Sequence, residues 1–362
     1  MSARLRPALL PATLALAAAP VLALPLDTLP LIDEPPAAGV RWQVELGHDF
    51  TRALGRLAGS EREAADQDRL ALSGQAGPWR LGLGLGGMTL HDGGDLHRLR
   101  GWEGSLRWQS TPDEADAASP EAAPLRWAVQ ASAWGHRADR LSQTTRGSLK
   151  VSGLNAQLTR FDVERPRDRQ WQLDLLGQGG TPWPGVAVTA VAGLGRSTVS
   201  NSGLGGAATI GGCSHELEFG TTRLIARPGP DCAYPLIISV PASLLKTDPR
   251  RETNYDARFA HLGVALHGRQ GPWQLSAGAD LQRWRRPGID DGPGATRTPV
   301  GRVVTLAARL SRDLGPDTRV SLQLRHADHR LVGEVPMLYG VRTASRFSSS
   351  QTQVELALAR RF

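Results

Sequence analysis

The sequence predicts an all-β fold, an antiparallel barrel of about fourteen strands that crosses a membrane. From Val40 to the last residue, segments of about ten residues alternate apolar and polar side chains, as strands between lipid and a polar interior do. The apolar faces are mostly Leu, Val and Ala, and the chain has only six Phe and three Tyr, too few bulky residues for a typical sandwich core. The last strand keeps its alternation up to Phe362, which indicates pairing to its end.

The N-terminal residues are expected to be a signal peptide. Arg4 and Arg6 precede a Leu/Ala-rich run, and small residues around Ala23 suit cleavage there. We therefore expect a signal peptide over 1–23, a periplasmic linker over 24–39 and a transmembrane barrel over 40–362.

The barrel strands are recognised by their period-2 pattern. In "WRLGLGLG" the residues Trp79, Leu81, Leu83 and Leu85 share one face, and glycines and Arg80 occupy the other. The same pattern predicts strands at 40–50, 66–74, 78–90, 98–110, 124–137, 143–152, 154–163, 168–177, 184–197, 253–267, 271–284, 299–313, 317–331 and 346–362.

One stretch, 143–163, allows two interpretations. Its apolar residues are odd-numbered up to Val151 and even-numbered from Leu154, so the alternation changes parity at Ser152-Gly153. A β-bulge there gives thirteen strands and a tight turn gives fourteen. We favour the turn, because an even count places both termini in the periplasm, as in single-chain bacterial barrels.

Tryptophans recur near the ends of the predicted strands. Two of them follow Gly-Pro in "AGPW" and "QGPW", which suits short periplasmic turns. Because an indole ring is apolar and its N–H is polar, Trp favours the membrane–water interface. The expected girdle consists of Trp42, Trp79, Trp108, Trp127, Trp183 and Trp273.

The C-terminal strand "VELALARRF" resembles the assembly signal of Gram-negative outer-membrane barrels. The matching residues are Val354, Leu356, Leu358 and Phe362, although Arg360 stands where that signal usually has an aromatic or apolar residue. The resemblance implies an outer-membrane location, contact with outer-membrane lipids and recognition by the barrel-assembly machinery.

The longest predicted loop, 198–252, holds both cysteines of the chain. In an exported protein Cys213 and Cys232 are expected to form a disulfide, and the alternative is a pair of metal-binding thiolates beside His215. The loop also contains the apolar stretch 234–245, which should fold into the barrel mouth as a lid or plug, or else form a patch for a partner protein.

The polar faces of the strands predict the lining of the lumen. Inward acids are expected at Glu45, Glu103, Asp174, Asp280 and Glu355. Such a wall either favours anions or is braced by arginine–carboxylate pairs. The expected inward arginines are Arg41, Arg80, Arg107, Arg126, Arg309, Arg319, Arg325 and Arg361.

No catalytic, metal or cofactor site is predicted. His326, Asp328 and His329 lie near a strand end and His261 and His267 face the lumen, but no known catalytic motif surrounds them. The chain has a formal charge of +7 without a basic stretch interleaved with aromatics, so a nucleic-acid partner is not expected.

These observations favour a channel or transporter for small, anionic solutes, gated by the 198–252 loop. The alternatives are a structural, adhesion or secretion and assembly barrel without an open pore and, less favoured, an outer-membrane hydrolase.

Overall fold

The computed structural model describes residues 29–32, 39–51, 65–92, 95–110, 125–151, 154–233, 236–245, 249–290, 300–338 and 351–362. The expected signal peptide, 1–23, lies outside the described residues. Within the described ranges, none of the helices is long and apolar enough to span a membrane.

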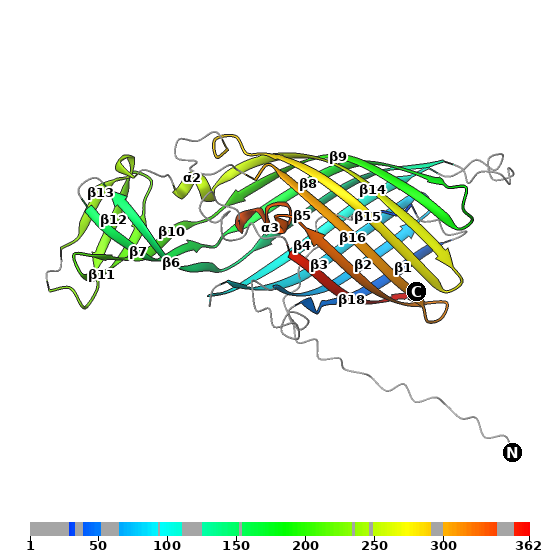
Figure 1. Cartoon of the computed structure of the whole chain (residues 1–362), viewed down its shortest axis with the longest axis horizontal. Helices are drawn as coiled ribbons and strands as arrows, with labels where there is room; N and C mark the ends of the chain where they lie inside the picture. The colour runs from blue at the N-terminus through cyan, green and yellow to red at the C-terminus, as the bar shows by residue number, and fades with distance from the viewer. Residues whose placement is uncertain are drawn as a thin grey trace, which may run out of the picture.

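The main body is a closed antiparallel barrel of twelve strands (Figure 1). Their order around the wall is β1-β18-β17-β16-β15-β14-β9-β8-β5-β4-β3-β2. The strands are β1 (Val40–Asp49), β2 (Ala65–Ala76), β3 (Trp79–Asp92), β4 (Asp95–Gln109), β5 (Arg126–Arg137), β8 (Arg167–Gly180), β9 (Val186–Ser200), β14 (Tyr255–Gln270), β15 (Trp273–Arg285), β16 (Arg302–Asp313), β17 (Thr318–Ala327) and β18 (Gln351–Arg361).

The barrel closes by pairing its first and last strands. Gln43 lies opposite Arg361, and the backbone N–H of Phe362 donates to Trp42 O at 3.0 Å. The terminal Phe is therefore the end of a fully paired strand, as the alternation predicts. Both ends of the barrel chain lie at one end of the barrel, and that this end faces the periplasm stays a prediction.

The two faces of the wall differ as the alternation predicts. Leu194, Leu262 and Leu358 are largely exposed on the outer face, whereas Thr189, His261 and Gln353 are buried on the inner face. An apolar exterior around a polar interior is the inverse of a soluble protein and is the arrangement of membrane barrels.

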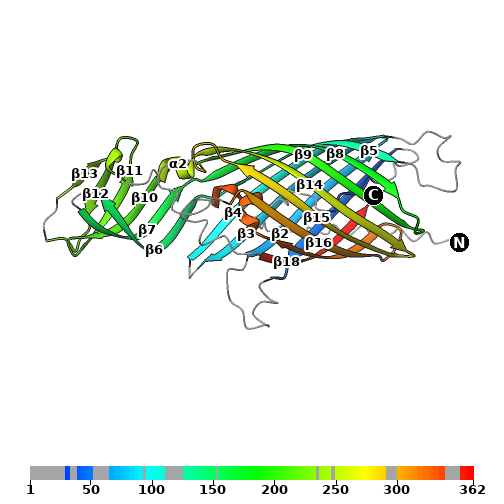
Figure 2. The same ribbon diagram turned by 45° about the horizontal axis from the view of Figure 1, so that its top comes forward.

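A second sheet of six strands extends the structure beyond one end of the barrel (Figures 1 and 2). Its order is β13-β12-β11-β10-β7-β6. We call it the outer sheet; it consists of β6 (Arg140–Val151), β7 (Leu154–Glu164), β10 (Gly203–Ile210), β11 (Cys213–Phe219), β12 (Arg223–Pro228) and β13 (Ile238–Pro241).

The prediction of fourteen barrel strands is therefore wrong by one hairpin. The segments 143–152 and 154–163 do form paired strands, as the tight-turn interpretation required, but these are β6 and β7 of the outer sheet. In the wall, β5 pairs directly with β8. The apolar residues Leu141, Ala156 and Leu158 are buried inside folded clusters instead of facing lipid.

The expected lid, 198–252, is also corrected. Its first residues complete β9, and much of the rest forms β10 to β13, a short 3-10 helix, η2 (Ala242–Leu244), and the start of α2 (Pro249–Thr253). Ile238 and Val240 of the apolar stretch pack on the core of the outer sheet, where Leu217 and Phe219 lie, instead of entering the barrel mouth. Figures 1 and 2 both place this sheet beyond the barrel.

Candidate functional site: the barrel lumen

The terminal end of the lumen is lined by arginines. A cavity of about 170 Å³ is bordered there by five of the eight expected inward arginines and by Glu45. These five are Arg41, Arg80, Arg309, Arg319 and Arg361. Because the β-strand period fixes which side chains point inward, residues far apart in sequence meet on this surface.

Several lumen arginines have polar partners. Arg319 Nε lies 2.7 Å from Asp313 Oδ1, and Arg309 Nε donates to Gln323 Oε1 at 2.8 Å. Arg107 Nε donates to Gln130 Oε1 at 2.7 Å. The remaining inward arginine of this half, Arg126, lies in the same inward row as buried Ala128 and Trp134. Bracing of the wall therefore accounts for part of the arginine set.

A central ion-pair cluster includes an arginine that the sequence interpretation missed. Arg69 of β2 pairs with Glu45 at 2.8 Å and with Glu103 at 3.2 Å. Glu355 of β18 is also buried. Arg69 could have been found, because it alternates with the apolar residues Leu70 and Leu72 in the same segment.

A second buried cluster joins three predicted inward residues. The imidazole of His261 lies between two carboxylates, with Nδ1 2.7 Å from Asp280 Oδ1 and Nε2 2.9 Å from Asp174 Oδ1. Gln172 Nε2 also donates to Asp174. The cluster ties β8, β14 and β15 together on the inner face of the wall.

Residues 29–32 occupy the lumen at the terminal end, where a periplasmic linker was expected. The side chains of Leu29 and Ile32 are buried, and Leu29 packs on Ala265 and Ala307 of the wall. Backbone groups of the segment bond to the wall: Arg107 Nη1 donates to Leu31 O at 2.7 Å, Ile32 N donates to Gln178 Oε1 at 2.8 Å, and His267 Nε2 lies 2.9 Å from Pro30 O. We call this segment the inner closure.

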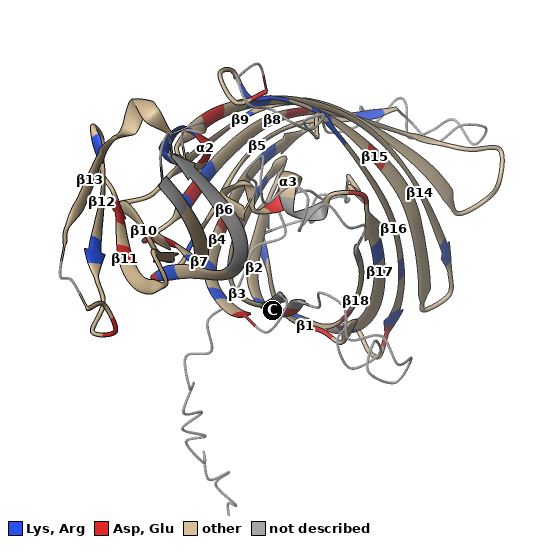
Figure 3. Ribbon diagram, turned by 60° about the vertical axis from the view of Figure 1, so that its left-hand side comes forward, with Lys and Arg blue, Asp and Glu red and all other residues tan. Residues whose placement is uncertain are grey.

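The opposite end of the lumen holds a segment that no sequence pattern predicted. After β17 the chain forms α3 (Arg330–Glu334) and a 3-10 helix, η3 (Pro336–Leu338), and Figure 3 shows α3 within the ring of strands. We call residues 330–338 the outer closure. The expected strand 317–331 thus ends early, at Ala327.

The outer closure packs on an apolar part of the inner wall. Val332, Val335, Met337 and Leu338 join a buried cluster with Trp134, Phe259 and Trp284. The ring centroids of Phe259 and Trp284 stack at 4.5 Å.

Polar contacts also hold the outer closure in place. Arg325, one of the expected inward arginines, forms a buried ion pair with Glu334. Tyr255 Oη donates to Pro336 O at 2.6 Å, and Gln170 Nε2 donates to Glu334 O at 3.1 Å. These contacts reach β8, β14 and β17, so the closure is bound to three parts of the wall.

A polar cavity of about 210 Å³ lies between the two closures. Leu29 of the inner closure and Trp134 of the apolar cluster both border it. Its remaining lining is dominated by Arg, Glu, Gln and Ser from seven strands, namely Gln43, Glu45, Arg69, Ser73, Arg80, Glu103, Ser105, Arg107, Gln130, Ser132, Arg309 and Gln323.

The six tryptophans of the expected girdle lie at the terminal end of the barrel. Five are exposed, and Trp108 is half-buried against Trp127 with ring centroids 4.7 Å apart. The exposed five are Trp42, Trp79, Trp127, Trp183 and Trp273.

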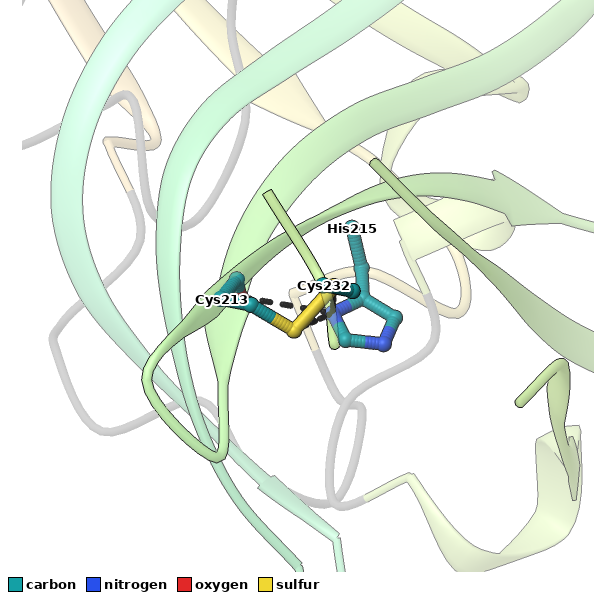
Figure 4. A group of neighbouring side chains, drawn as sticks. All are labelled: Cys213, His215 and Cys232. Atoms are coloured by element: carbon teal, nitrogen blue, oxygen red, sulfur yellow. Dashed lines mark hydrogen bonds between the residues drawn. A yellow bond between two sulfur atoms is a disulfide. The ribbon is translucent and has the colours of Figure 1, made fainter. Parts of the chain in front are cut away.

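The two cysteines form a disulfide in the outer sheet, with a Cα–Cα separation of 5.1 Å. His215 Nδ1 lies 3.9 Å from the sulfur of Cys213 and 4.0 Å from that of Cys232 (Figure 4). Because the sulfurs are bonded to each other, the two thiolates that a metal would need are not present.

His326 lies near the end of β17, and His329 follows this strand. His326 Nδ1 lies 3.0 Å from Thr352 Oγ1, and its Nε2 is 3.9 Å from Asp328 Oδ1, with both side chains substantially exposed. His329 has a left-handed backbone, with φ of 55°, where the chain turns toward the outer closure.

The even strand number, the exposed apolar rows and the polar lumen decide the class of protein. The chain has the fold of an outer-membrane β-barrel. No family model and no curated protein matches its sequence.

Similar solved structures include the translocator domain of the autotransporter NalP from Neisseria meningitidis, which is 10% identical with a TM-score of 0.43 and coverage of 90% of this chain and 89% of that one. The KdgM porin is 7% identical, with a TM-score of 0.37 and coverage of 88% and 99%. LpxR from Salmonella typhimurium is 9% identical, with a TM-score of 0.38 and coverage of 88% and 99%.

Proposed function

We propose that this protein is an outer-membrane channel or transporter for small solutes, and that two segments of its own chain close its lumen. The single observation that carries the proposal is the polar cavity between the inner and outer closures. A barrel that only needs a rigid wall can fill its interior with wall side chains. Here the ends are blocked by short segments outside the wall strands, and a segment held by side-chain contacts can move without breaking the barrel.

The composition of the lumen favours anionic solutes. At the terminal end five arginines border the cavity, and Glu45 is the one acid among the described residues that line it. The low-dielectric wall focuses the electric field of this excess of positive charge. Rings of arginine favour anions in pores. The solute is therefore proposed to be small and negatively charged.

The route to the membrane is part of the same proposal. A signal peptide over 1–23 would direct export, and the terminal strand with Phe362 would be recognised by the barrel-assembly machinery. The exposed tryptophans would then lie at the periplasmic interface, in contact with outer-membrane lipids.

The conductance of the purified protein in planar bilayers tests the proposal. Three variants are compared with the wild type: one that begins at residue 33, one with 330–338 replaced by a Gly/Ser segment of equal length, and their combination. Because the two closures lie in series, either single variant should conduct rarely, like the wild type, and the combination should open stable channels. A Cys213→Ser/Cys232→Ser variant, altered outside the barrel, should match the wild type. If the folded combination stays silent, the wall side chains block the lumen and the proposal fails.

Ion selectivity tests the anionic preference in the open combined variant. Adding Arg41→Gln, Arg80→Gln and Arg319→Gln removes three positive charges from the lumen, so the reversal potential in a KCl gradient should shift toward cation preference. Arg269→Gln with Arg312→Gln is the matched control, since both residues are exposed at the same end of the barrel. An equal shift in the control would show that the lumen charges do not set selectivity.

A second candidate function is adhesion by a barrel without a pore. It is favoured by the outer sheet, which projects beyond the barrel and carries the disulfide. Silent channels in every folded variant would favour this function over transport.

A further inference from the structure

A belt of ten exposed arginines surrounds much of the barrel at the end away from the termini. Each lies in an outward row of its strand, as Arg196 follows Leu194 and Arg283 follows Leu281. The arginine belt consists of Arg98, Arg100, Arg137, Arg167, Arg169, Arg196, Arg258, Arg283, Arg285 and Arg302.

The belt begins at the height where the apolar band ends. Along β15, Trp273 and Arg283 are separated by 283 − 273 = 10 residues, and Leu275, Ala277, Ala279 and Leu281 lie between them on the same face. Ten residues rise about 33 Å along a strand, or about 25 Å along the barrel axis at a tilt of about 40°. This is the height of the apolar band of an outer-membrane barrel, so the arginines lie at the level of lipid headgroups.

The arginines of the belt lie opposite one another in the sheet. The register pairs Arg100 with Arg137, Arg137 with Arg167, Arg196 with Arg258, Arg258 with Arg285, and Arg283 with Arg302. Like charges directly opposite across a sheet are destabilising, and anions from outside the chain would relieve this repulsion. Among the described residues, Asp256 is the one carboxylate that forms an ion pair with the belt, through Arg196 at 3.2 Å.

Two hollows adjoin on the belt over β9, β14 and β15. One, of about 570 Å³, is lined by Arg196, Arg251 and Arg258, by Thr198 and Asn254, and by Asp256, which pairs with Arg196. The other, of about 680 Å³, lies toward the apolar band and has almost entirely apolar walls, including Leu173, Leu194, Leu262 and Leu281, with Arg283 at its border. Small side chains at Ala192 and Ala260 leave room between these leucines.

We propose that this pair of hollows binds a phosphorylated lipid of the outer leaflet. Its phosphate groups contact Arg196, Arg258 and Arg283, and one acyl chain lies in the groove between Leu194 and Leu262. Arginine suits this role because its planar guanidinium donates two parallel hydrogen bonds to phosphate. A second copy of the chain docked symmetrically on the same face would oppose arginine to arginine, which disfavours that occupant. The inference rests on the membrane-barrel fold and on the predicted periplasmic position of the termini, and it is independent of channel function.

Binding of a defined lipid to the folded full-length protein in neutral detergent tests the proposal. The probes are bisphosphorylated lipid A, the same lipid after removal of its phosphates, and inorganic phosphate. Lipid A should bind far more tightly than either other probe. The variant Arg196→Gln/Arg258→Gln/Arg283→Gln should weaken its binding about a hundredfold, because each basic residue near an anionic surface is worth about fivefold. Arg269→Gln with Arg312→Gln, exposed at the other end, should leave binding unchanged.

A second variant separates the acyl groove from the charges. Ala192→Phe/Ala260→Phe fills the groove and keeps every arginine, so it should weaken lipid A binding as well. Folding of each variant is checked by heat-modifiable gel mobility. Equal binding of the dephosphorylated lipid would overturn the role of the arginines. Competition by inorganic phosphate at the concentration at which lipid A binds would show a free-anion site and would overturn the lipid assignment, as would unchanged binding in either variant.

Discussion

At the scale of single residues, a glycine makes the buried His261 cluster possible. A Cβ built on Gly193 of β9 would collide with Asp174 Oδ1 and His261 Nε2, both partners in the cluster. Glycine is therefore required there by close approach and not by backbone conformation. The cluster in turn joins strands of the wall that are distant in sequence.

Replacing this glycine should destabilise the barrel. We expect Gly193→Ala to cost about 1–3 kcal/mol, the usual range for overpacking a filled interior, because two hydrogen-bonded side chains must move. Gly177→Ala on β8 is the matched control, since a Cβ there meets nothing within 4 Å. The midpoint temperature of the heat-modifiable gel shift measures the stability of both variants. Equal midpoints for the two variants would contradict the argument.

At the scale of elements, the hairpin of β6 and β7 is tied together by one buried carboxylate. Asp162 of β7 accepts from Arg140 Nη2 at 2.5 Å, from Arg160 Nε at 2.8 Å and from the hydroxyl of Ser142. Burial alone would raise the pKa of Asp162, but the hydrogen bonds from Ser142, Arg140 and Arg160 outweigh it and hold the pKa below its ordinary value. The charged form thus stabilises the outer sheet.

This lowered pKa predicts an acid-sensitive outer sheet. Because the pKa of Asp162 is lower in the folded state, its contribution is fully present above the ordinary Asp value of 3.8 and is lost as pH falls below it. Pepsin should therefore cleave the outer sheet of the wild type faster at pH 2.5 than at pH 4.5, beyond the change in pepsin activity on a denatured control. The Asp162→Asn variant should be cleaved readily at both pH 2.5 and pH 4.5. If its cleavage depends on pH as that of the wild type does, the role of Asp162 is refuted.

At the scale of the whole molecule, the barrel and the outer sheet are two separate sheets: in the described part of the chain, no barrel strand pairs with a strand of the outer sheet. Two insertions supply the outer sheet, one between β5 and β8 and one between β9 and β14. At their bases Arg137 lies opposite Arg167, and Tyr255 lies opposite Val199, so the wall pairs directly across each insertion.

The barrel should therefore fold without the outer sheet. A variant with 139–165 and 202–253 each replaced by a short Gly/Asn turn should keep a β-rich circular dichroism spectrum and a heat-modifiable gel shift. The wall hydrogen bonds are unchanged, and a closed barrel has no free edge that needs a partner. Recovery of this variant only as aggregate, under conditions in which the wild type refolds, would show that the two parts fold together.

The sequence by itself determined the segments that form the barrel wall, which of their faces are apolar and where the barrel closes, but it placed β10 to β13 in a loop. Alternation at Trp79–Leu85 or Val354–Leu358 is a local property, because side chains alternate across any strand whatever its neighbour. The same rule placed Arg80 and Arg319 inward, and two cysteines in a chain with an expected export signal implied the disulfide.

Only the tertiary structure decided which strands pair and what fills the lumen. The hairpin at 143–163 has the same period-2 pattern as a wall strand, and its partner, β10, is chosen by contacts distant in sequence. The closures at 29–32 and 330–338 have no periodic pattern, and their position depends on cavities that exist only after the wall has closed. Local patterns encode the strands, whereas non-local packing selects their partners and closes the lumen.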